Sequence, residues 1–519
     1  MKKQLRLTSI LTALLIFILL PTGCFTPNDT SDADPTETAD ISSALDFTSI
    51  ESVINSCGID FGIISEKLGK NEYITQAEFQ QLLNNTVQAA NGNFTPGDGV
   101  LTYEDMSFML IDALGYDELA QRMIMLNYFP GKDVYLTVLK DFGMIYKSGR
   151  DIIDIDMQTA VYCEEAAYAL AVAHDNLNKK IEFANAFYAV NSYSQLDFID
   201  KFEAVCYGWS KLEAIDGELH LTWDGNTEYS VPSGYRKAFD KADGKIKMLF
   251  VSHDGMNASQ LLTDAYRSKA VDLMSNAADG IIKGEETLIF DGVVVDFEGL
   301  RQKSLQDFNS FLTDLSAQLK AKNKLMYVAV HPKSREWQAH FDGYDYRLIG
   351  EIADKVILMA HDYRPVSLSD YEMETGVVLT PLAPIDEIYY ALHAITDNET
   401  GVAEKSKILL QISLDTAQWK LTDGKVINKR PYMPSYETLK TRIEKGTELK
   451  YSTAYESPYT VFKNEDDGTD NVVWYEDYRS IQAKIKLCGQ FGITGLSVWR
   501  LGNIPDGSRE IGFNMMDLF

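Results

Sequence analysis

The pattern of hydrophobic and polar residues changes character near residue 180. Upstream of it, apolar residues recur at the three- and four-residue spacing of a helix face, as in residues 74–83, 101–114 and 161–170. In the first two of these segments a threonine precedes an acid by three residues, which is the pattern of a capped helix start. Residues 45–180 are therefore predicted to form a small all-α domain.

Downstream of residue 180, short apolar runs alternate with helical patterns. Several of the runs are continuously apolar, as in strands of a parallel sheet buried on both faces. Helices are predicted between them, for example over residues 261–279, 305–321 and 475–491. Eight such units within residues 181–519 predict an α/β fold, a (β/α)8 TIM barrel, with a doubly wound sheet as the alternative. The predicted strands are Ala184–Ala189, Ala204–Tyr207, Ile246–Ser252, Gly292–Glu298, Leu325–Val330, Lys355–Ala360, Lys407–Ile412 and Gly495–Trp499.

The first residues have the pattern of a targeting segment. Three positive residues precede the apolar run Leu7–Leu20, which is too short for a comfortable membrane span, and Cys24 follows it closely. Residues 1–23 resemble a bacterial lipoprotein signal, which implies that Cys24 is lipidated and that the protein lies on the extracellular face of the cell membrane. An ordinary secretory signal with an incidental cysteine is the alternative. Residues 24–44 are polar and acidic and are predicted to form a disordered linker.

Charge and cysteine content limit the classes of partner and cofactor that are expected. The chain has 48 basic and 76 acidic residues, which argues against nucleic acid or an anionic membrane surface as the main partner. Contact with the membrane is therefore expected through the lipid anchor only. The four remaining cysteines are scattered and form no pattern with zinc-ligand spacing, so neither a structural metal nor a cofactor is expected.

The predicted strand ends carry the candidate chemistry. In the run FDGVVVDFEGL, Asp296 and Glu298 are two residues apart, so both side chains should project from the same face of a strand. Catalytic residues of β/α barrels lie at the carboxyl ends of strands, where Trp499 and several polar side chains are also expected. Acids and flat aromatic rings on one rim are typical of a carbohydrate cleft, in which an acid protonates the glycosidic oxygen.

Three segments resemble motifs of family 18 glycoside hydrolases, most of all the bacterial branch that includes spore-germination cortex and peptidoglycan hydrolases. Residues 291–298 match the family's Asp-Gly-x-x-x-Asp-x-Glu strand motif. Residues 356–363 resemble its Met-x-Tyr-Asp region, and residues 495–502 resemble its last strand, which carries a tryptophan. The resemblance covers roughly residues 181–502.

This resemblance implies a retaining mechanism assisted by the substrate's own 2-acetamido group. Glu298 would act as acid and then as base, and Asp296 would orient the acetamido group and stabilise the charged intermediate. A neighbouring Asp296 anion is also expected to raise the pKa of Glu298. The motif makes Asp291 a third candidate catalytic residue, with a turn or cap as the alternative. The implied sugar-binding residues are His361, Asp362, Tyr363, Trp499 and Arg500, and the implied substrate is a glycan containing N-acetylglucosamine, either peptidoglycan or chitin-type.

Three positions depart from the family pattern. Val294 stands where many members have Asp or Asn, His361 stands where a tyrosine is usual, and Gln411 replaces an expected small residue. An inactive barrel that binds wall glycan as a lectin or scaffold is therefore the alternative function. His361 with Asp362 could also be a structural pair and Trp499 plain barrel core, and His331 is interpreted as structural.

The three helix-start patterns before residue 180 suggest degenerate copies of one unit. They resemble S-layer homology repeats, which implies that residues 45–180 bind a cell-wall polymer. A generic helical domain with well-capped helices is the alternative.

Overall fold

The computed structural model describes residues 47–87, 96–146, 155–189, 191–224, 229–253, 262–333, 342–361, 363, 366–375 and 381–519. The predicted signal, Cys24, the predicted linker and Asp362 lie outside these residues. Within them, no helix is both long enough and apolar enough to cross a membrane.

The N-terminal part of the described chain is helical, as predicted. Thr102 caps its helix as expected, because its hydroxyl accepts from the Asp105 backbone and Asp105 accepts from the Thr102 backbone. Thr75 and Glu78 exchange the same pair of bonds. The helices are α2 (Phe47–Ser56), α3 (Gln76–Val87), α4 (Tyr103–Ala113), α5 (Asp117–Met125), α6 (Val134–Asp141) and α7 (Cys163–Asn178).

The three predicted helix starts lie together in space. Short antiparallel bridges join Tyr73 to Tyr162, Thr75 to Val100 and Thr102 to Ala160. The segments that lead into α3, α4 and α7 are thus hydrogen-bonded to one another, and their interpretation as related units stays a prediction.

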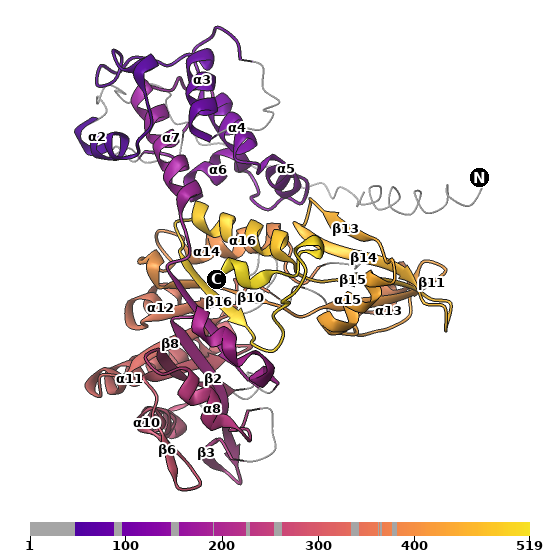
Figure 1. Ribbon diagram of the computed structural model, residues 1–519. Helices are drawn as coiled ribbons and strands as arrows, with labels where there is room; N and C mark the ends of the chain where they lie inside the picture. Colours follow the sequence, from indigo (N-terminus) through magenta and orange to yellow (C-terminus); the bar gives the residue numbers. More distant parts are fainter. Residues whose placement is uncertain are drawn as a thin grey trace, which may run out of the picture.

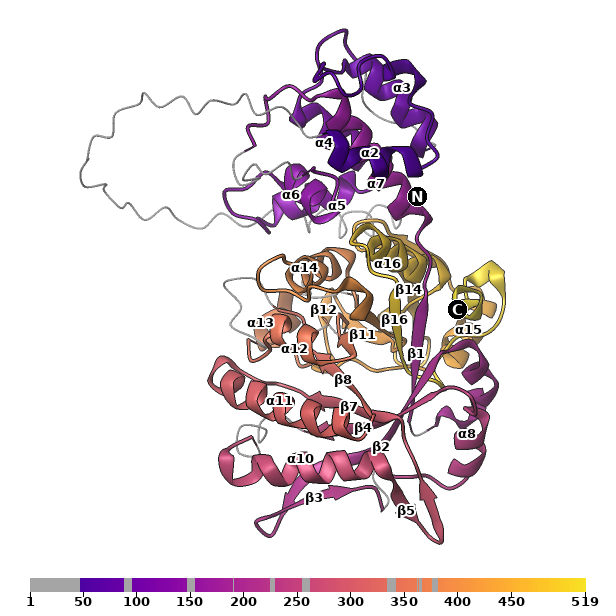
Figure 2. The same ribbon diagram turned by 90° about the vertical axis from the view of Figure 1, so that its left-hand side faces the viewer.

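Eight parallel strands within the described residues close into a barrel (Figures 1 and 2). The first barrel strand pairs with both the second and the last. The first and last strands therefore have no free edge, and the sheet is closed. This closure confirms the predicted TIM barrel and rules out the doubly wound sheet, because an open sheet would have two edges. The strands are β1 (Phe183–Tyr188), β2 (Ala204–Ile215), β4 (Ile246–His253), β7 (Gly292–Phe297), β8 (Leu325–Val330), β9 (Lys355–Leu358), β10 (Ile408–Ser413) and β16 (Gly495–Trp499).

Helices surround the barrel and smaller elements decorate it. The outer helices are α8 (Tyr235–Lys241), α10 (Asp264–Asp279), α11 (Leu305–Ala321), α12 (Tyr346–Ile352), α14 (Ile385–Ile395) and α16 (Tyr478–Gln490). Helix α13 (Asp370–Thr375) packs instead against β12 (Lys425–Val426). β3 (Glu218–Thr222) extends β2, and β5 (Ile281–Lys283) pairs with β6 (Glu286–Leu288). The 3₁₀ segments are η2 (Gly62–Ile64), η4 (Ser192–Lys201), η5 (Gln302–Ser304), η6 (Lys405–Lys407), η7 (Arg509–Ile511) and η8 (Met515–Leu518).

A second sheet is inserted between β10 and α16, and Figure 1 shows it projecting from one side of the barrel. The sequence analysis did not predict it. Its antiparallel strands are β11 (Ala417–Thr422), β12 (Lys425–Val426), β13 (Leu449–Ser452), β14 (Ser457–Lys463) and β15 (Asp470–Trp474), and it carries helix α15 (Tyr436–Glu444).

The helical region packs on α14 and α16 through a contact that is partly polar (Figure 2). Arg122 donates to Asp386 over 2.8 Å, and Asp386 is almost fully buried. The carboxylate of Asp141 contacts Nδ1 of His393 at 2.8 Å and accepts from the Tyr389 hydroxyl. Since buried charges need partners, these contacts hold the two parts in one relative position.

Candidate active site

The two acids of the FDGVVVDFEGL run lie at the carboxyl end of β7. Asp296 is 7% exposed and lies directly above Val294 on the inward face of the strand. Glu298 follows the last residue of β7, and its side chain is 54% exposed. The predicted pair therefore consists of one buried carboxyl group and one that reaches water.

Burial and charge act strongly on Asp296. Removal from water raises its pKa well above the usual range, and the neighbouring Glu298 carboxylate raises it further, while His361 opposes the shift. Its Oδ1 makes no hydrogen bond with any residue that the structure describes. The raised pKa expected for Glu298 stays a prediction. For Asp296, burial of the carboxyl group beside Glu298 raises the pKa.

His331 lies beside the exposed acid. Its Nε2 is 3.6 Å from Oε2 of Glu298, and its side chain is 18% exposed. The sequence analysis interpreted His331 as structural. The signal that it missed is topological, because β8 pairs with β7 and His331 directly follows β8, at the same rim as Glu298.

The two polar departures from the family pattern contact each other. Nε2 of His361 is 2.7 Å from Oε1 of Gln411, and Nε2 of Gln411 donates to Ser497 over 3.3 Å. With the amide in this orientation its oxygen accepts, so Nε2 of His361 carries the proton. The substitutions therefore form one hydrogen-bonded chain across β10 and β16, which holds the imidazole in a fixed orientation.

Trp499 closes the top of the barrel interior. Its ring centroid is 5.2 Å from that of Phe187 and 6.2 Å from that of Phe250. The side chain is only partly buried, and Arg500, which follows it, is also partly exposed. Trp499 thus packs on the core below and retains accessible surface at the rim.

Asp291 lies at the opposite end of β7 from Glu298. Six residues of strand, about 20 Å at the usual rise, separate them. The Asp291 carboxylate accepts from the backbone N–H of Lys247 over 2.8 Å. The predicted catalytic role is therefore wrong and the alternative, a cap, is correct, because Asp291 cannot reach a sugar that Glu298 contacts.

Two further predicted residues are not placed at the acids. The hydroxyl of Tyr363 donates to the backbone carbonyl of Glu387 in the outer helix α14, over 3.4 Å. Asp362 lies outside the described residues. Among the residues that the structure describes, no group of three His, Cys, Asp or Glu side chains could hold a metal ion.

A family model described as glycosyl hydrolases family 18 matches residues 167–503. The chain belongs to glycosyl hydrolase family 18. The match begins inside α7 and ends just after β16, so it covers the whole barrel together with the inserted sheet.

Curated relatives in this family include two cortical fragment-lytic enzymes. The one from Bacillus subtilis (strain 168) is 25% identical over 225 residues, which is 43% of this chain and 49% of that protein. The one from Bacillus anthracis is 25% identical over 210 residues, covering 40% and 45% respectively. The chain thus spans about half the length of the curated relatives that it matches.

Solved structures of family 18 proteins share the fold. A chitinase from Chromobacterium violaceum ATCC 12472 is 22% identical with a TM-score of 0.50, covering 65% of this chain and 97% of that chain. The spore cortex-lytic enzyme SleL from Bacillus cereus is 18% identical with a TM-score of 0.50, covering 75% and 84%. At these identities the likeness supports the architecture alone.

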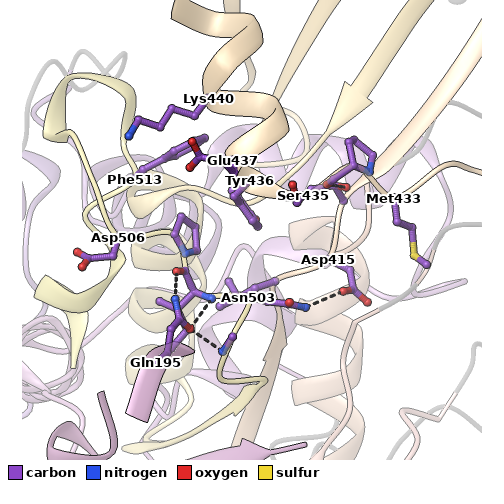
Figure 3. A pocket seen from close by; sticks show the side chains of 16 residues that line it. Gln195, Asp415, Met433, Ser435, Tyr436, Glu437, Lys440, Asn503, Asp506 and Phe513 are labelled. Atoms are coloured by element: carbon purple, nitrogen blue, oxygen red, sulfur yellow. Dashed lines mark hydrogen bonds between the residues drawn. The ribbon is translucent and has the colours of Figure 1, made fainter. Parts of the chain in front are cut away.

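A cavity of about 400 Å³ opens beside the rim of this family 18 barrel (Figure 3). Leu414 and Asp415, which follow β10, form one wall, and residues 502–506, which follow β16, form another. The start of α15 in the inserted sheet completes it. The strand pattern that predicts Asp296 and Glu298 does not predict this cavity, because much of the lining comes from the insertion.

Proposed function

We propose that this protein is a retaining glycosidase that cleaves N-acetylglucosamine-containing glycan, with peptidoglycan as the substrate. The observation that carries the proposal is the buried Asp296 beside the half-exposed Glu298 at the carboxyl end of β7 in a family 18 barrel. Two of its curated relatives are described as cortical fragment-lytic enzymes, which supports a wall glycan as the substrate.

Substrate binding would move a proton from Asp296 to Glu298. In the free protein, burial favours the protonated form of Asp296. The N–H of the sugar's 2-acetamido group would donate to the Asp296 oxygen that makes no hydrogen bond with the described residues, which favours the carboxylate. The proton of Asp296 then passes to Glu298, so that Asp296 becomes anionic and Glu298 becomes the acid.

Cleavage proceeds in two steps. Glu298 gives its proton to the glycosidic oxygen as the acetamido carbonyl oxygen attacks the anomeric carbon, and the bond to the leaving sugar breaks. The resulting oxazolinium ion is stabilised by the Asp296 carboxylate. Glu298, now a carboxylate, takes a proton from water, and the hydroxide so formed opens the oxazolinium ring at the anomeric carbon with net retention.

Neighbouring side chains support these steps. His331, 3.6 Å from Glu298, can donate to its carboxylate once the proton has left. The His361–Gln411 pair fixes a polar group near enough to act on the pKa of Asp296, and Trp499 offers a partly exposed ring on which the apolar face of a sugar can lie.

Glu298→Gln tests this assignment. The amide keeps the shape of the side chain but cannot donate an acidic proton or accept one from water, so turnover of N-acetyl-chitooligosaccharides or purified sacculi should fall at least about 100-fold. Circular dichroism and the thermal midpoint should remain unchanged. Equal turnover by the wild type and Glu298→Gln would show that Glu298 is not the acid.

A glycan-binding barrel without turnover is the second candidate. Val294 favours it, because this fully buried aliphatic side chain stands where many members have a polar partner for the residue equivalent to Asp296. Measurable affinity for chitooligosaccharide with no product between pH 4 and pH 8 would select this function over the first.

The envelope location is proposed from the sequence alone. Cys24 would carry the lipid, and residues 45–180 would contact a wall polymer. Labelled palmitate should enter the wild-type protein and not Cys24→Ala. Unlabelled wild-type protein, or a Cys24→Ala variant that is labelled equally, would overturn the anchor.

Residues 45–180 should co-sediment with purified cell walls, and their absence from the wall pellet would overturn the wall contact.

A further inference from the structure

The cavity beside β10 and β16 is built on rigid parts. Oε1 of Gln195 accepts from the backbone N–H groups of Gly502 and Ile504, over 2.6 and 3.2 Å, which fixes the loop after β16. The hydroxyl of Tyr436 accepts from the backbone N–H of Glu476 over 3.1 Å, which fixes the start of α15. The walls are therefore preformed, so a ligand would not have to order them.

Both signs of charge line this cavity. Glu437 and Asp506 are exposed acids, and Lys440 is a half-buried base on α15 (Figure 3). Among the described residues, none of these three side chains has a hydrogen bond or ion-pair partner. Side chains of both charges on fixed elements are suited to a ligand that carries both an ammonium and a carboxylate.

The cavity adjoins the proposed sugar site. Ser413 is the register partner of Trp499, and the backbone N–H of Leu414 donates to the Trp499 carbonyl over 3.1 Å. Leu414 itself lines the cavity, so the space opens next to the backbone of Trp499 at the end of the barrel strands. A substituent of the bound glycan that extends over this strand end would reach the cavity while its sugar stays on the rim.

We propose that this cavity binds the peptide substituent of peptidoglycan. The inference rests on the proposed glycosidase function and specifies its substrate class. Stem peptides carry free carboxylates and, at a diamino acid, an ammonium group, whereas chitin carries neither. The ammonium would lie against Asp506, and a carboxylate would lie against Lys440.

Binding to matched ligands tests the site. The full-length Glu298→Gln protein, which would not consume the ligand, is titrated calorimetrically with a peptidoglycan fragment. It is then titrated with the same fragment after an amidase has removed its peptides. The peptide-bearing fragment should bind about fivefold tighter, the effect of one partly exposed ion pair. Equal affinity for the two fragments would overturn the proposal.

Matched variants test whether the preference for the peptide-bearing fragment arises in the cavity. Lys440→Gln combined with Asp506→Asn, in the same background, should bind both fragments equally. Glu444→Gln with Lys445→Gln at the exposed end of α15 makes the same change in net charge outside the cavity and should keep the preference. A preference that survives the cavity variant would also overturn the proposal.

Turnover separates this inference from the proposed function. Protein with the native Glu298 should hydrolyse the amidase-treated fragment. If it does not, but the binding preference holds, the glycosidase proposal fails while the peptide site stands. Hydrolysis without any binding preference would contradict the proposed peptide site and leave the glycosidase proposal standing.

Discussion

At the scale of single residues, the site depends on which carboxyl group is buried. Asp296 and Glu298 are two positions apart, yet one is 7% exposed as a residue and the other has a 54% exposed side chain. The alternation of a strand predicts their common face, but it does not reveal where the strand ends. Since β7 ends at Phe297, Glu298 extends past the sheet into water, whereas burial raises the pKa of Asp296 well above its usual range.

Val294→Thr should lower the pKa of Asp296. Threonine has the shape of valine, and its hydroxyl can donate to the Asp296 oxygen that makes no hydrogen bond within the described structure. Because the folded-state pKa of Asp296 is raised, stability falls as pH increases from about 4 through that pKa. The variant should lose less stability over this range, at an overall penalty of about 1–3 kcal/mol for burying the hydroxyl. Chemical unfolding at a series of pH values measures both effects.

Val293→Thr is the matched control. Val293 is equally buried but belongs to the cluster outside the barrel interior, so the same hydroxyl cannot reach Asp296. A parallel pH dependence in the two variants would show that Val294 does not influence the acid.

At the scale of elements, all eight barrel strands could be predicted because they are short, largely apolar runs that the barrel buries on both faces. The inserted sheet could not, because β11 and β14 mix polar and apolar residues on a sheet with an exposed face. The long interval between β10 and α16 was an available signal, since βα loops are usually short. The cavity was missed for the same reason. Two of the three helix starts could be predicted because threonine–acid caps are local patterns. The contact of His361 with Gln411 could not, because it depends on the pairing of β9 with β10.

At the scale of the whole molecule, the contact between the helical region and the barrel should be sensitive to pH. Asp141 on α6 contacts His393 on α14 at 2.8 Å and raises the pKa of the imidazole, although burial opposes the shift. Asp397 adds to the rise and Lys132 acts against it. A raised histidine pKa contributes stability that is complete below about pH 6.5, the unfolded value, and is lost as pH rises through the folded value.

His393→Gln should remove this dependence. The wild-type free energy of unfolding should fall as pH increases from about 6.5, and the variant should be nearly flat there. The variant should also be less stable at pH 6 by about 1.5–3 kcal/mol, which is typical of a lost hydrogen bond to a charged group. His220→Gln, on the exposed face of β3, keeps the Asp141 contact and should titrate like the wild type. If His220→Gln flattens the profile as much as His393→Gln does, the dependence does not arise at the contact between α6 and α14.

Because that contact joins the helical region to the glycosidase barrel, its loss at high pH would loosen the two parts without altering the rim that carries Glu298.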